Sequence, residues 1–185
     1  MNKILFVSII SIFISQMGFA QDSLIKYEKI VILDSSYTKT ELFIKARQWI
    51  SDNFRDAKAI LTIEDKESGE LSGNARISIV PLKGMQNLGI QYVRFKCSII
   101  LKDGKYKCSF YNFEHESLTA LSSLGMLTSS SKYPYAPYKG LGAKMFNNTL
   151  NNAWIDVKEQ VEKEIENSYT SLERAIREKE KNEGW

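Results

Sequence analysis

Cysteine and histidine are scarce in this chain, which has two cysteines and one histidine in 185 residues. The two sulfurs have no histidine near them, so a zinc site is not predicted. No serine, cysteine or threonine stands in a pattern with a base and a third orienting group, as nucleophilic catalysis requires. We therefore predict a protein without catalytic residues, metal or cofactor, long enough to bury a core without disulfide staples.

An excess of charge of one sign is also missing. The 25 basic residues are balanced by 22 acidic residues, and the net charge is +3. Without residues 1–20, which contain one lysine, 24 basic residues remain. Such a balance predicts neither a nucleic-acid surface nor a strong attraction to membranes.

The chain has no apolar run of about 20 residues, the length that a transmembrane helix needs. The run over 4–14 is shorter and precedes the small residues Gly18 and Ala20, which is typical of a secretory signal peptide over residues 1–20. An uncleaved anchor is the alternative. No cysteine near the cut could carry a lipid. We expect residues 21–185 to be an exported protein, periplasmic or secreted, without stable membrane insertion.

Hydrophobic periodicity predicts one α+β domain over residues 21–185. Its order is strand, helix, four strands, helix, and short turns between consecutive strands imply a five-stranded antiparallel sheet packed by helices in two layers. The expected strands cover 25–33, 58–65, 71–82, 89–101 and 105–113, the helices cover 38–53 and 148–181, and a long irregular segment covers 114–147.

Two local signals refine the helices. Thr38 followed by Glu41 is a capping-box pattern and predicts the start of the first helix. The segment 167–171, Asn-Ser-Tyr-Thr-Ser, is poor helix-forming sequence and predicts a kink or break in the last helix.

Asp103-Gly104 predicts a two-residue hairpin loop. Counting outward from it, Cys97 faces Phe110, so Cys97 and Cys108 are diagonal neighbours on one apolar side. Diagonal Cα atoms lie ~7–8 Å apart, whereas a disulfide needs ~4.4–6.8 Å. Two buried free thiols are therefore predicted, although a bulged turn could shift the register and allow a bond.

The surface candidate is the segment 133–138, "YPYAPY". Tyr133, Tyr135 and Tyr138 offer large contact areas with polar tips, and prolines stiffen the segment. The function we predict is non-enzymatic binding of a cell-envelope partner, an unknown protein or an apolar small ligand. The alternative for these rings is that they only cover the sheet or the helix.

Two other functions stay open. His115, flanked by two glutamates, could serve a hydrolase-like enzyme, although a surface loop residue is the favoured interpretation. The apolar stripe of the last helix, from Leu150 to Ile176, could instead mediate self-association of a structural envelope protein.

Three segments carry a resemblance to a known family: "YTKTELFIKARQWISDNF", "AILTIEDKESGELSGNARISI" and "VRFKCSIILKDGKYKCSF". Over about residues 25–113 the chain resembles a family of exported bacterial proteins, domain-of-unknown-function family 4468, which has a TATA-binding-protein-like (TBP-like) fold. The resemblance implies the same order of strands and helices. It transfers no functional residues and does not imply DNA binding, and segment 114–147 has no match in it.

Overall fold

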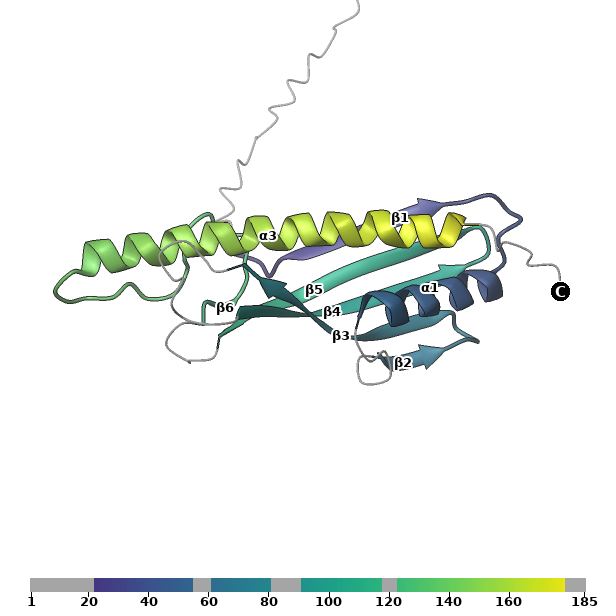
Figure 1. Ribbon diagram of the computed structural model, residues 1–185, viewed down its shortest axis with the longest axis horizontal. Coiled ribbons are helices and arrows are strands. Elements are labelled where there is room, and N and C mark those ends of the chain that lie inside the picture. The colour runs from purple at the N-terminus through teal and green to yellow at the C-terminus, as the bar shows by residue number, and fades with distance from the viewer. Residues whose placement is uncertain (1–21, 55–60, 81–90, 118–122, 179–185) are drawn as a thin grey trace, which may run out of the picture.

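The computed structural model describes residues 22–54, 61–80, 91–117 and 123–178, which form an antiparallel sheet covered on one face by two helices (Figure 1). In chain order the elements are β1 (Lys26–Ile32), α1 (Lys39–Asn53), β2 (Leu61–Asp65), β3 (Glu70–Ile79), β4 (Gln91–Lys102), β5 (Lys105–Ser117), β6 (Gly125–Met126) and α3 (Ala143–Arg177). The strand order is β1-β5-β4-β3-β2, with β6 paired to β5. The predicted two-layer α+β class is confirmed. The predicted signal peptide, 1–20, lies outside the described residues.

Helix α1 begins where the capping box predicts. The Thr38 hydroxyl accepts a hydrogen bond from the Glu41 amide over 3.2 Å, which satisfies one free N–H of the first turn. The buried face of α1 consists of Leu42, Phe43, Ala46, Trp49 and Ile50. The helix ends at Asn53, as predicted.

The hairpin around Gly104 has the predicted register. Lys102 lies opposite Lys105, and Cys97 lies opposite Phe110. Gly104 has a φ of +67°, a conformation that glycine adopts without strain. Both cysteines are free and buried, as predicted. Burial raises the pKa of the Cys108 thiol well above its ordinary value, which keeps it protonated.

Strand β5 contains a β-bulge at Asn112. The register with β4 shifts between Arg94 and Lys96, so β5 fits one more residue than its partner strand. Asn112 has a φ of +57°, in the left-handed region that asparagine tolerates. The large buried side chains of β5 therefore fall at even positions up to Phe110 and at odd positions from Phe113 onward.

This bulge corrects two predictions. The strand expected to end at residue 113 continues to Ser117, because the alternation only changes its phase at Asn112. His115, interpreted as a surface loop residue, lies inside the strand and is fully buried. A third correction concerns the irregular segment expected over 114–147: residues 114–117 belong to β5, 125–126 form β6, and 143–147 belong to α3.

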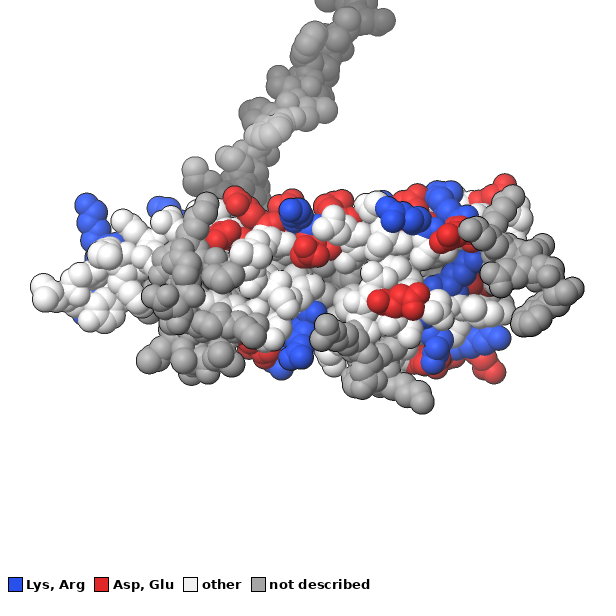
Figure 2. All heavy atoms as spheres, in the orientation of Figure 1, with Lys and Arg blue, Asp and Glu red and all other residues white. Residues whose placement is uncertain are grey.

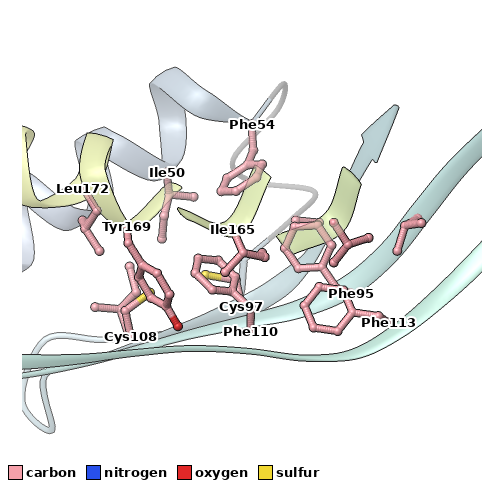
Figure 3. Packing of buried hydrophobic residues seen from close by; sticks show 14 of the residues in the cluster. Ile50, Phe54, Phe95, Cys97, Cys108, Phe110, Phe113, Ile165, Tyr169 and Leu172 are labelled. Carbon is pink, nitrogen blue, oxygen red and sulfur yellow. The ribbon is translucent and has the colours of Figure 1, made fainter. Parts of the chain in front are cut away.

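The core lies between the sheet and the two helices (Figure 3). Phe95 is its centre: its ring stacks on Phe113 at 5.3 Å and contacts Phe110 edge-on at 5.8 Å. Helix α3 adds Tyr169, whose ring lies 5.3 Å from that of Phe110. Cys97 packs in the same cluster, so this space is filled by side chains.

Helix α3 is continuous through 167–171, so the predicted break there is wrong. Tyr169 and Leu172 bury their side chains against the core. The hydroxyl of Ser171 accepts a hydrogen bond from the indole of Trp49 over 2.9 Å. These tertiary contacts outweigh the weak helix propensity. None of the described helices is long and apolar enough to cross a membrane.

Candidate functional site

The segment after β6 is held against the first turns of α3. Tyr133 donates its amide hydrogen to the Asn151 side-chain oxygen over 2.9 Å, and its ring lies edge-on to Trp154 at 5.8 Å. The Trp154 indole donates to the Ser130 carbonyl over 3.0 Å. Tyr133 is half-buried, so of the three predicted tyrosines it is the one that mainly covers the helix.

Tyr135 is 42% exposed and is held by its hydroxyl, which donates to the Met126 carbonyl over 3.1 Å. The ring lies over Gly125, where a Cβ atom would approach the Tyr135 hydroxyl to 3.1 Å. A glycine at this place therefore leaves room for the ring.

Tyr138 is 50% exposed and is held from the helix side. Its amide donates to the Asn147 side-chain oxygen over 2.9 Å, and the Asn147 side-chain nitrogen donates back to the Tyr138 carbonyl over 3.1 Å. The ring contacts Phe146 edge-on at 5.4 Å. Two hydrogen bonds and a ring contact thus hold Tyr138 on the helix start.

Together with the start of α3, these tyrosines form an exposed apolar end of the molecule. We call it the tip surface and define it as Tyr135, Tyr138, Leu141, Met145 and Phe146. Leu141 is fully exposed, Met145 is 78% exposed, and Phe146 is 46% exposed. The first turns of α3 extend past the end of the sheet (Figure 1), so the tip surface projects from the body. Tyr138 and Phe146 are in contact within it, and exposed apolar patches mark interaction sites.

The charged residues of the segment that carries the tip surface have one sign. From residue 118 to residue 155 the sequence contains no aspartate or glutamate, and its charged residues are Lys132, Lys139 and Lys144. All three lysines are exposed. Figure 2 shows this end of the molecule in white and blue, whereas the rest of the body carries both red acidic and blue basic groups. Sequence reasoning missed Leu141, Met145, Phe146 and these lysines, although the run without acids was visible in the sequence.

His115 does not form a surface site. Its Nδ1 accepts a hydrogen bond from the Leu124 amide over 3.1 Å, and its Nε2 lies 3.1 Å from the side-chain oxygen of Gln91. A neutral ring protonated on Nε2 satisfies both partners. Burial lowers the pKa of His115 to about 4, so the ring is uncharged at neutral pH. Within the described residues no group of three His, Cys, Asp or Glu side chains is placed to hold a metal.

A cavity of about 520 Å³ lies elsewhere, along the part of β3 that extends beyond β2. Its walls are Asn53, Phe54, Asn74, Ala75, Arg76, Ser78, Tyr92 and Arg94. The Arg76 guanidinium lies 4.8 Å from the centre of the Tyr92 ring. Arg94 pairs with Glu114 at 2.8 Å and Glu116 at 3.1 Å. Most of these wall residues are polar, which does not suit the apolar small ligand of the sequence prediction.

Comparison with known proteins shows what the fold resembles. A solved DUF4468 family protein from Bacteroides ovatus ATCC 8483 is 10% identical, with a TM-score of 0.59 over 85% of this chain and 89% of that one. A TBP-like protein from Parabacteroides distasonis ATCC 8503 is 13% identical, with a TM-score of 0.49 over 81% of this chain and 93% of that one. None of the curated proteins matches significantly. At these identities the first likeness concerns the fold alone.

The sequence itself gives the family. Residues 27–116 match the family described as a domain of unknown function (DUF4468) with TBP-like fold. The match covers the sheet from β1 to β5 and helix α1, and it ends before the tip surface. This agrees with the resemblance expected from the sequence, and the chain therefore contains a DUF4468 domain of TBP-like fold.

Proposed function

We propose that this protein is an exported, non-enzymatic binding module of the cell envelope, and that it contacts its partner through the tip surface. One observation carries the proposal: Leu141 is fully exposed and Met145 is 78% exposed, next to a segment that hydrogen bonds hold in place. Leaving two large apolar side chains in water forgoes the stabilisation that burial would give. Contact with a partner would recover it.

A protein or envelope surface suits this geometry better than an apolar small ligand. Such a ligand would need an enclosed apolar space. Between the sheet and the helices that space is taken by core side chains such as Phe95 and Ile165, and by Leu124 and Leu127 from the segment after β5. The tip surface, in contrast, projects outward and encloses nothing.

The two alternative functions find less support. A hydrolase mechanism would need His115 in contact with substrate, and both of its ring nitrogens face protein groups in the interior. Self-association through the stripe from Leu150 to Ile176 would need that stripe free. Its large members, including Trp154 and Leu172, are buried against this protein's own core.

Export is part of the proposal and has its own test. The signal-peptide pattern predicts a mature chain that begins at Gln21. N-terminal sequencing or intact mass of the protein from its bacterial host should give that start in an envelope or secreted fraction. An intact N-terminus in the cytoplasmic fraction would remove export from the proposal.

The tip surface can be tested with exposed substitutions that leave the core alone. The variant combines Leu141→Ser with Met145→Ser, and the control is Ile32→Ser, which is 78% exposed at the other end of the molecule. The mature chain is mixed with washed host envelopes, and saturable binding is measured by sedimentation. We expect the double variant to lose binding and the control to retain it. Equal binding by both would overturn the role of the tip surface.

A further inference from the structure

We propose that the tip surface docks on the anionic surface of a lipid bilayer. This inference rests on the proposed function and names its partner. The docking is peripheral: the tip enters the interface between headgroups and acyl chains, while the sheet stays in water.

The shape of the tip surface fits a bilayer. The first turns of α3 and the loop before them extend past the sheet as a narrow end (Figure 1). Leu141 and Met145 are its most exposed apolar side chains. A narrow, projecting apolar end can enter a headgroup layer, as the apolar faces of interfacial helices do.

The aromatic residues of the tip surface also suit the headgroup layer of a bilayer. Tyr135 and Tyr138 each combine an exposed ring with a polar hydroxyl, and Phe146 lies beside Tyr138. Tyrosine is enriched where membranes meet water, because its ring suits the apolar side and its hydroxyl suits the headgroups.

The charges point to anionic headgroups. Lys132, Lys139 and Lys144 form no ion pair with any described residue, whereas lysines elsewhere do, such as Lys26 with Glu28 at 2.7 Å. The start of helix α3 also lacks acidic residues: its N-cap is Gly142 and its first turn contains no aspartate or glutamate. Each lysine near an anionic membrane surface contributes to binding, and its long side chain lets the ammonium reach the phosphates while the backbone lies deeper.

A second copy of this chain fits the tip surface less well. In a two-fold contact the same patch meets itself. The lysines of the two patches, Lys139 and Lys144 of each copy, would then be brought close together, with no carboxylate between residues 118 and 155 to offset the repulsion. An anionic membrane, in contrast, offers negative charges that attract these lysines.

The test uses the mature chain from Gln21, because the signal peptide would itself bind lipid. Vesicles of phosphatidylcholine with about one-third phosphatidylglycerol are compared with pure phosphatidylcholine by co-sedimentation. We expect binding to the anionic vesicles that weakens at least about tenfold when Lys132, Lys139 and Lys144 are changed to glutamine, and that is screened by salt. Leu141→Ser with Met145→Ser should abolish it, while Ile32→Ser should not.

A dye attached to a single cysteine shows which face of the protein enters the bilayer. Leu141→Cys offers a fully exposed thiol, whereas Cys97 and Cys108 are buried and shielded from labelling in the folded protein. An environment-sensitive dye at position 141 should shift to the blue on anionic vesicles, and the same dye on Ile32→Cys should not. Vesicle binding without a shift at 141 would overturn the inference, since another face would then carry it. Circular dichroism melting checks that each variant is folded.

The outcomes separate this inference from the proposed function. If vesicles are not bound but the double variant still loses envelope binding, the lipid inference is overturned and a protein partner takes its place. A dimer that the double variant dissolves, without vesicle binding, also overturns it in favour of a second copy. If the double variant changes neither vesicle nor envelope binding, both proposals fall.

Discussion

His115 makes the stability of this protein depend on pH in a way that follows from its surroundings. The ring is fully buried, and Nδ1 accepts a hydrogen bond from the Leu124 amide. Protonation of Nδ1 would break that bond and place a charge in the interior. Burial accordingly lowers the pKa of His115 from its ordinary value of 6.5 to about 4.

The sign follows from proton binding. Between about pH 4 and pH 6.5 the unfolded chain holds a proton on this histidine and the folded chain does not, so acid favours unfolding. The contribution of His115 is complete above the unfolded pKa and is lost as the pH falls toward the folded one. From these two pKa values, the free energy of unfolding should fall by about 2 kcal/mol between about pH 7.5 and about pH 5.

The assay is urea unfolding at the two pH values, followed by the fluorescence of the buried Trp49 and Trp154. The matched variant is His115→Asn, whose amide oxygen can still accept a hydrogen bond but does not titrate. Asparagine leaves a small cavity and lowers stability at both pH values. Only the difference in pH response between the two proteins tests the prediction.

Other titrating groups cancel in this comparison. The hydrogen bond from Lys26 lowers the pKa of Glu28, and the one from Arg177 lowers the pKa of Glu173. These carboxylates stabilise the fold above the unfolded pKa and lose that effect at more acidic pH. Both stay in the variant. If wild type and His115→Asn lost the same stability between the two pH values, the buried neutral imidazole would be refuted.

Four further predictions concern the core and its turns. Gly69→Ala should lower the free energy of unfolding by about 2 kcal/mol or more, because φ is +74° and the new methyl group would lie 2.4 Å from a main-chain oxygen. Gly142→Ala has a φ of +79° but open space around the new methyl group, so it should lower the free energy of unfolding by only about 1 kcal/mol. Thermal melts of both glycine variants measure the two effects. Tyr169→Phe should keep stability or raise it by up to about 1 kcal/mol in urea unfolding, because among the described residues its buried hydroxyl has no hydrogen-bond partner. Non-reducing mass spectrometry should find Cys97 and Cys108 as free thiols in the mature protein, and a mass lower by two protons would contradict the observed register.

Features that depend on a few neighbouring residues could be read from the sequence. The Thr38 cap needs one hydroxyl and one amide three residues away, and both are local. The Asp103-Gly104 loop sets the pairing of its own strands, so the positions of Cys97 and Cys108 followed by counting. These signals sufficed for the start of the first helix and for the free thiols.

The bulge at Asn112 shows where such counting fails. One extra residue reverses which positions of the strand face the core. A reader who continues the alternation unchanged past the bulge finds apolar residues at the wrong positions and takes the segment for a loop. The left-handed conformation of Asn112 accompanies the register shift against β4 near Arg94, far along the hairpin from its turn at Gly104, and asparagine is also common in ordinary turns. His115 was misplaced for this reason alone.

Helix α3 illustrates a different limit. Its segment 167–171 is weak by intrinsic propensity, which is worth only a few tenths of a kcal/mol per residue. Burial of Tyr169 and Leu172 and the hydrogen bond from Trp49 to Ser171 are each worth more. Those partners come from α1 and the sheet, so the continuity of the helix depends on tertiary contacts that a local window does not contain.

The tip surface was only partly anticipated because net charge is an average over the whole molecule. A near-balance of basic and acidic residues argued against an attraction to membranes, yet a contact responds to charges within about 10 Å at moderate salt. In the segment that surrounds Leu141 the charged residues are lysines, since the sequence has no acid between residues 118 and 155. Acids lie instead on the sheet and on the later turns of α3, such as Glu114 and Glu173, where they pair with Arg94 and Arg177. A protein with a small net charge can therefore present one positively charged, apolar end, and the distribution of acids along the chain is the sequence signal to examine.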